Sequence, residues 1–257
     1  MNRLLIALLL LAGLARANSD AQAPVAPPDW VQNYMQRQFP LSEKWQCRLH
    51  EGPAFASGKD RASYCMRYQQ HRRVGNLNYV LFLGDNLLTA QVNPGLAMLV
   101  VLDDDGQPQS SGSMLVGSWG NAPTIWQWRQ LGPDVWAADG EVGDSQQGTI
   151  CGSRVLLYPQ GRQIRRERIA SRLDNRAQWE NCDEDCERQQ TLLKAELRVR
   201  DDLAPVKGLY PLEMLVEGYR GIKRYATKYN DQVFTFSHDG EHYRAPEDYP
   251  LPAPADF

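Results

Sequence analysis

The sequence lacks the residue patterns that most catalytic sites require. It has only four histidines in 257 residues, and none of them lies in an HExxH pattern. It also has no GxSxG nucleophile motif, no glycine-rich phosphate loop and no dinucleotide-binding fingerprint. Aspartate and glutamate are frequent, but no spacing singles out a catalytic pair. We therefore expect no catalytic residue, no metal ligand and no cofactor, and the sequence favours a protein that is not an enzyme.

Long apolar runs and an excess of basic residues are also absent from most of the chain. The one uninterrupted apolar run, residues 4–15, follows a short charged start and precedes the triplet Ala15, Arg16, Ala17, an order typical of a cleaved secretory signal. The run is too short to cross a bilayer as a helix, which takes roughly 20 residues. Loss of residues 1–17 takes two arginines from the 28 basic residues and leaves 26 against 31 acidic ones. We expect a periplasmic or secreted protein without a membrane span after cleavage, and no nucleic-acid partner.

Cysteine is scarce, and its count of five is odd. Disulfides persist in an oxidising compartment, and an odd number of cysteines leaves at least one thiol outside an intramolecular pair. Cys47 and Cys65 lie in two strand-like segments that can run side by side, which predicts a disulfide between them. Cys182 and Cys186 enclose three acidic residues, and we predict a second disulfide there that pins an acidic loop, with a soft-metal site as the alternative. Cys151 is then the remaining thiol, which we expect to be buried and inert.

The two ends of the predicted exported chain differ in composition from its middle. Residues 18–29 are small, polar and proline-rich and predict a flexible lead. The segment DWVQNYMQRQF has apolar residues at helical spacing, so we predict one short helix with Asp29 as its N-cap, ending before Pro40. Residues 249–257 contain closely spaced prolines and predict an extended tail. No linker divides residues 30–248, which we expect to form a single β-rich domain.

Short apolar or alternating segments separated by turn residues fill the rest of the chain. This pattern is typical of antiparallel strands. The segment TLLKAELRV, for example, alternates apolar and charged residues with a period of two, so it predicts a strand rather than a helix. The run from Leu96 to Leu102 has no polar alternation and must be covered on both faces. We therefore predict a mainly β protein: an antiparallel two-layer sandwich or partly open barrel with one short N-terminal helix.

The stretch SHDGEH, residues 237–242, resembles a metal site in composition. Asp-Gly between two alternating runs is, however, a strong signal for a two-residue hairpin turn. With Asp239 and Gly240 at the tip, His238 lies opposite Glu241, and His242 falls on the other face. The two histidines would then point away from each other, and one face would offer too few ligands for zinc. We predict a hairpin rather than a metal site.

Tryptophan is abundant, and four of the seven residues lie between Trp119 and Trp136. Trp126 and Trp128 share one face of a predicted strand, and a turn at LGPD would place Arg129 opposite Trp136, where its guanidinium can stack on the indole. Two interpretations remain open for these rings. They can pack in the core, or Trp126, Trp128 and Trp136 can form an aromatic platform for a ligand.

Together these observations favour a non-enzymatic protein of the cell envelope or medium. We expect it to bind an unknown ligand or another protein through loops or an aromatic groove. The alternative is an extracytoplasmic hydrolase that uses Cys151 or an acidic pair in a tryptophan-lined cleft. A structural or assembly role at the cell surface is a third possibility.

Overall fold

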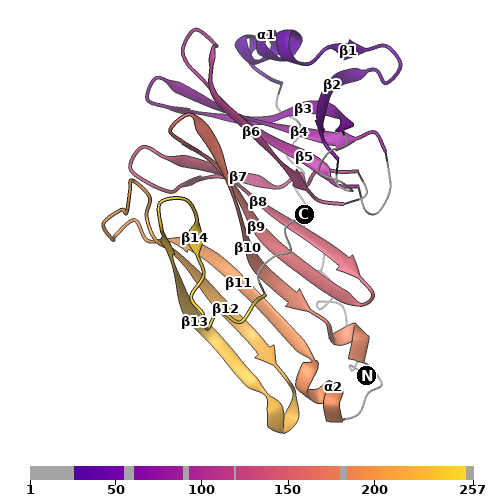
Figure 1. The fold of residues 1–257 in the computed structure, drawn as a ribbon, viewed down its shortest axis with the longest axis vertical. Coiled ribbons are helices and arrows are strands. Elements are labelled where there is room, and N and C mark those ends of the chain that lie inside the picture. Colours follow the sequence, from indigo (N-terminus) through magenta and orange to yellow (C-terminus); the bar gives the residue numbers. More distant parts are fainter. Residues whose placement is uncertain (1–25, 55–60, 89–92, 119, 180–183, 253–257) are drawn as a thin grey trace, which may run out of the picture.

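The protein is mainly β-structure and forms two antiparallel sheets (Figure 1). The structure is a computed structural model that describes residues 26–54, 61–88, 93–118, 120–179 and 184–252. The first sheet contains, in spatial order, β1 (Leu41–Ser42), β2 (Cys47–Pro53), β3 (Arg61–Val74), β4 (Leu77–Asn86), β5 (Gly95–Leu102) and β6 (Pro108–Val116). The second contains β7 (Trp126–Gln130), β8 (Trp136–Gln146), β9 (Thr149–Gln160), β10 (Gln163–Asp174), β11 (Thr191–Val199), β12 (Leu212–Arg220), β13 (Thr227–His238) and β14 (Tyr243–Arg244). Within each sheet, every strand pairs with its neighbours in sequence, and neither sheet closes into a barrel over the described residues.

The helix predicted near the start of the chain is present as α1 (Asp29–Gln38), which confirms that expectation. Its buried residues follow the helical spacing seen in the sequence: Val31, Tyr34 and Met35. Asp29 is the first helical residue rather than the N-cap, because the first helical hydrogen bond runs from the N–H of Gln32 to the carbonyl of Pro28. The carboxylate is still well placed there, since the first turn of a helix favours negative charge.

The central strand β5 explains why the first sheet is covered on both faces. Its even-numbered residues from Leu96 to Leu102 pack against the core beneath α1. The odd-numbered residues Ala97, Leu99 and Val101 pack against the second sheet. All eight residues of the strand are buried. The prediction that this run needs a layer on each side is therefore confirmed, and the two sheets form the predicted sandwich.

The second sheet is itself covered on both faces along β9. Leu157 points into the core shared with the first sheet, whereas Leu156 and Tyr158 point into a third core on the opposite side. Residues of β11–β14 complete that third core, among them Met214 and Phe234. The strands β11–β14 therefore pack over the face of β8–β10 that points away from the first sheet.

The change of layer occurs between β10 and β11. These strands share only three residue pairs, from Arg172 with Lys194 to Asp174 with Leu192. Just before this short contact, the register of β10 with β9 shifts between Ala170 and Arg172, which marks a β-bulge. A bulge bends a strand and increases its twist, so β11 leaves the plane of β10 and continues above it.

The cysteines test several expectations. Cys47 and Cys65 form a disulfide between β2 and β3, as predicted. The predicted pair with Cys182 lies outside the described residues. The second half of the predicted acidic loop is instead the short helix α2 (Glu184–Gln189). Cys151 lies on β9 and is exposed, so the expectation of a buried thiol is wrong. Cys151 lies near the start of β9, whereas Val155 is the first residue of this strand that belongs to either core.

The C-terminal residues join the fold instead of extending from it. Leu251 is buried in the third core, with Tyr249 packed against it. The hydroxyl of Tyr249 donates a hydrogen bond of 2.5 Å to the carbonyl of Ala170. Residues 249–252 are therefore not an extended tail, and residues 253–257 lie outside the described residues.

Two short 3₁₀ turns, Arg176–Trp179 and Lys223–Tyr225, complete the structure. In the described part of the chain, no helix is long and apolar enough to cross a bilayer.

Candidate functional site

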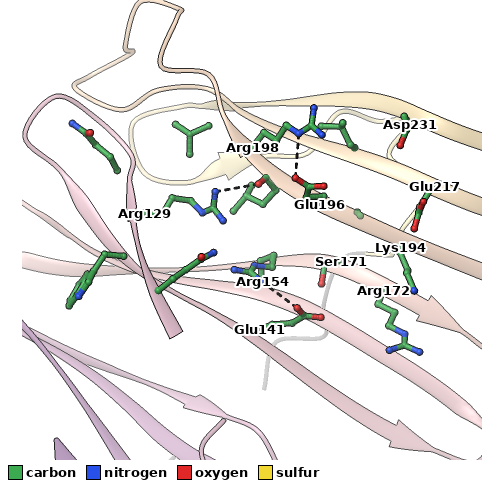
Figure 2. Close-up of a pocket in the computed structure, with 17 residues that line it drawn as sticks. Arg129, Glu141, Arg154, Ser171, Arg172, Lys194, Glu196, Arg198, Glu217 and Asp231 are labelled. Carbon is green, nitrogen blue, oxygen red and sulfur yellow. Dashed lines mark hydrogen bonds and ion pairs between the residues drawn. The ribbon is translucent and has the colours of Figure 1, made fainter. Parts of the chain in front are cut away.

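A large polar cleft opens beside β11, where this strand separates from β10 (Figure 2). Its volume is about 1030 Å³, at the upper end of the range of ligand sites, roughly 300–1,000 Å³. We call it the polar cleft. The residues that line it come from β7–β13: Gln127, Trp128, Arg129, Gln130, Glu141, Arg154, Ser171, Arg172, Lys194, Ala195, Glu196, Leu197, Arg198, Val199, Leu215, Glu217 and Asp231.

The unpaired edge of β11 forms one wall of the polar cleft. Residues 194–199 of this strand all line the cleft, an unbroken run that includes apolar and charged positions alike. Pairing with β10 ends at Lys194, so residues 195–199 have no strand beside them on this side among the described residues. The cleft therefore borders on the backbone of β11 and not only on its side chains.

Hydrogen bonds at both ends of β11 show which backbone groups face the cleft. The carbonyl of Leu197 accepts a 3.3 Å hydrogen bond from Nη1 of Arg129, across the cleft, and the carbonyl of Thr191 accepts one from the N–H of Asn175. In an antiparallel strand, the N–H and C=O of one residue point to the same side, and this side alternates along the chain. Ala195, Leu197 and Val199 thus direct their backbone groups towards the cleft, while even-numbered residues bond to β12.

A buried carboxylate holds the opposite wall of the cleft in place. Asp139 of β8 is fully buried and accepts hydrogen bonds from Nε of Arg129 at 2.6 Å and from Nε of Arg154 at 3.0 Å. Gln127 adds a third donor at 2.9 Å. Arg154 also contacts the exposed Glu141 at 3.4 Å. A buried charge needs such partners, so this network fixes the arginines whose other groups line the cleft.

The three tryptophans of the proposed platform lie elsewhere. Trp126 is 7 % exposed within the core between the sheets, and its indole N–H donates to the carbonyl of Pro123 at 2.8 Å. Trp128 and Trp136 are half-buried and pack against the same core. This placement corresponds to the core-packing interpretation of these rings, and only Trp128 contributes to the lining of the polar cleft.

The predicted contact between Arg129 and Trp136 is wrong. The turn between β7 and β8 is one residue longer than expected, because Leu131 bonds to Val135 at its base. Gln130 is therefore the residue opposite Trp136. The guanidinium that stacks on this indole belongs to Arg72 of β3, whose Cζ lies 3.2 Å from the ring centroid.

The hairpin in SHDGEH has a different register from the predicted one. His238 pairs with Tyr243 rather than with Glu241, so residues 239–242 form a four-residue turn. Oδ1 of Asp239 accepts the N–H groups of Glu241 and His242 at 2.8 and 2.9 Å. These two bonds stabilise the longer turn and lower the pKa of Asp239, with a smaller contribution from Arg244. The side chain of Asp239 thus accepts hydrogen bonds from two backbone N–H groups of the turn.

The longer turn brings both histidines to one group of side chains, which we call the histidine cluster: the buried Tyr158, Glu167 and His238 and the partly exposed His242. Nδ1 of His242 lies 3.1 Å from Oε1 of Glu167, and the hydroxyl of Tyr158 donates to the same oxygen at 3.2 Å. Nε2 of His238 lies 3.4 Å from the Tyr158 oxygen. The prediction that the histidines point away from each other is therefore wrong. In the described residues, no three His, Cys, Asp or Glu side chains are arranged to hold a metal ion.

The hydrogen bonds of the histidine cluster determine its protonation. Nδ1 of His238 accepts the N–H of Gly240 at 3.0 Å, so the proton of a neutral ring is on Nε2, facing Tyr158. Burial lowers the pKa of His238, which favours this neutral form. Burial raises the pKa of Glu167, although His242 and Tyr158 act in the opposite direction. Burial also raises the pKa of Tyr158, and Glu167 raises it further.

The comparisons with known proteins add no relative to this picture. Neither protein-family models nor curated proteins nor solved structures match the chain.

The polar cleft was not predicted from the sequence. The one available signal is the alternation of Lys194, Glu196 and Arg198 along β11, and it does not reveal that the neighbouring edge is unpaired.

Proposed function

We propose that this protein is a non-enzymatic binding protein of the periplasm or the medium that holds an extended peptide segment of a partner in the polar cleft. The peptide adds a strand to the edge of β11. The observation that carries this proposal is the run Ala195, Leu197 and Val199, whose backbone groups face the cleft. Strand addition supplies affinity through main-chain hydrogen bonds and specificity through alternate side chains.

The dimensions of the cleft support an extended ligand. Residues 195–199 provide five strand positions, which span about 17 Å. Open strand edges are usually blocked in proteins because they invite pairing with other chains. Here the edge lies inside the polar cleft, so we expect it to accept a single chain rather than a second sheet. Arg129 already donates to the carbonyl of Leu197, so a peptide would exchange or share that bond.

The side chains of the cleft support a polar peptide. Arginines of the β7–β9 wall face one side of the bound strand, and both signs of charge occur around the cleft. The disulfide between Cys47 and Cys65 supports an oxidising location, and the signal-like residues 1–17 predict export. A hydrolase with a tryptophan-lined cleft has less support, because the indole rings pack at the interface of the two sheets.

A selection from a displayed library of random twelve-residue peptides tests the proposal. We expect selected peptides, made synthetically, to bind in a fluorescence anisotropy assay. Methylation of backbone nitrogens should weaken binding at alternate positions only, because alternate amides face β11. A peptide that binds equally well with every amide methylated would contradict strand addition, as would a selection without any binder.

A pair of substitutions at one position provides the matched control. Ala195→Pro removes an N–H that faces the cleft and leaves the ladder with β12 intact, whereas Ala195→Ser keeps the N–H. We expect Ala195→Pro to weaken binding about tenfold, the loss of one or two hydrogen bonds, and Ala195→Ser to bind like the wild type. Circular dichroism and urea unfolding of both variants verify that each is folded. Equal affinities of the two variants would contradict the role of the β11 edge.

A further inference from the structure

Two cations lie directly opposite each other at one end of the polar cleft. Arg172 of β10 and Lys194 of β11 are partners in the register, and both line the cleft (Figure 2). Like charges at directly opposed positions of a sheet are unfavourable. Because the two positive charges repel each other, an anion bound between them would stabilise the pair.

Arg172 has no carboxylate within hydrogen-bond distance among the described residues. Its ion pair with Asp174 is long: Oδ2 of Asp174 lies 3.9 Å from Nη2, which is longer than a hydrogen bond. Both oxygens of Asp174 instead accept bonds of 2.9 Å from Arg176, whose guanidinium is the main cause of the lowered pKa of Asp174. The carboxylate of Asp174 is thus bound by Arg176 rather than by Arg172.

Lys194 is in a similar position. Glu217 of β12 is its register partner on the other side, yet no ion pair joins them among the described residues. The next acidic residue on β11, Glu196, pairs with Arg198 at 3.4 Å. The other arginines of the cleft, on β7 and β9, are held by Asp139. Among the cations of the cleft in the described structure, Arg172 therefore has only a long contact with a carboxylate that Arg176 binds, and Lys194 has no ion pair.

Two buried polar atoms beside these cations have no hydrogen-bond partner among the described residues. They are Oγ of Ser171 and Nε of Arg172. Ser171 is only 4 % exposed and lines the cleft, and a buried hydroxyl without a partner is costly. Gly152 on β9 allows Arg172 and Ser171 to pack closely against it, since a Cβ there would lie 2.9 Å from Cβ of Arg172 and 3.6 Å from Oγ of Ser171.

We infer that Ser171, Arg172 and Lys194 form a carboxylate-binding subsite within the polar cleft. It takes the C-terminal carboxylate or an Asp or Glu side chain of the bound peptide, so this assignment rests on the proposed function. Arginine and lysine supply the charge, and the serine hydroxyl donates a third bond. A monoanion fits better than a phosphate dianion, because Glu217 and Asp231 also line the cleft.

Sodium acetate tests the subsite without any peptide. We expect titration of the ¹⁵N-labelled protein to give saturable amide shifts at residues 171, 172 and 194. These shifts should disappear in the double variant Arg172→Gln/Lys194→Gln. They should persist in the control Arg162→Gln/Lys228→Gln, which loses two exposed cations outside the cleft. Absent or unsaturable shifts in the wild type, or equal shifts in both double variants, would overturn the subsite.

The selected peptides identify which carboxylate is bound. Each peptide is compared with versions in which the C-terminus is amidated or one Asp or Glu becomes Asn or Gln. We expect one such change to weaken wild-type binding about tenfold or more and to have little effect on Arg172→Gln/Lys194→Gln. Amidation identifies the C-terminus, and a side-chain change identifies that residue. If peptides bind without any carboxylate dependence, the subsite is refuted and strand addition stands. If acetate binds but no peptide is selected, the subsite stands and the peptide proposal fails.

Discussion

Nδ1 of His242 lies 3.1 Å from Oε1 of Glu167, a residue that precedes it by 75 positions. The carboxylate is 8 % exposed and the imidazole 45 % exposed, so the pair joins a buried acid to a ring that reaches solvent. This contact fixes the turn after β13 on the face of β10. It also places the turn next to Tyr158 and His238, so we expect the stability of the hairpin to depend on pH.

Acidification is expected to destabilise the protein through His238. Burial lowers the pKa of this residue, so the unfolded chain binds its proton more readily than the folded one. The stabilising contribution is present above the ordinary histidine pKa of about 6.5 and is lost as the pH falls through the lowered value. A proton on Nδ1 would also face the N–H of Gly240.

Urea unfolding between pH 8 and pH 5 measures this effect. The wild type should lose stability as the pH falls, and His238→Gln should lose less. His50 and His71 also have pKa values lowered by burial, so part of the slope remains in the variant. Identical pH profiles for the two proteins would refute the role of His238.

Removal of the buried carboxylate of Asp139 should be strongly destabilising. Asp139→Asn leaves Arg129 and Arg154 without their shared charge, and loss of one partner from a buried ion pair costs about 3–5 kcal/mol. The control is Glu141→Gln, which removes the exposed partner of Arg154 and should cost less than about 1 kcal/mol. Chemical denaturation gives both values, and similar costs for the two variants would contradict the assigned network.

Reduction of the disulfide should lower stability by a moderate amount. Cys47 and Cys65 are 18 residues apart, and closing a loop of that length contributes about 3 kcal/mol through the unfolded state. The free energy of unfolding should therefore fall by about this amount for Cys47→Ser/Cys65→Ser. The same change in wild-type protein under reducing conditions would assign the effect to the bond. An unchanged free energy would show that the bond does not constrain the unfolded chain.

Local patterns in the sequence predict much of the fold. The apolar spacing of α1 and the alternation in β11 each specify one element with one buried face. The run of β5 goes further and predicts the number of layers, because apolar residues on both faces of a strand must both be covered. These inferences hold because they depend only on neighbours within a few residues.

The cleft depends on events that such patterns do not record. We attribute the separation of β11 from β10 to a bulge at Ser171, and nothing in residues 170–172 predicts a bulge rather than regular pairing. The histidine cluster depends on whether Asp239 occupies a two-residue or a four-residue turn. Two added turn residues move the register partner of His238 from Glu241 to Tyr243. In this register His242 contacts Glu167 and His238 contacts Tyr158.

Residue-resolved hydrogen exchange of β11 with a bound peptide tests the central claim most directly. Strand addition predicts that the amides of Ala195, Leu197 and Val199 become protected when the peptide binds. The amides of Glu196 and Arg198 already bond to β12, so their exchange should change little. Binding that leaves the odd-numbered amides of residues 195–199 as exchangeable as before would contradict the account.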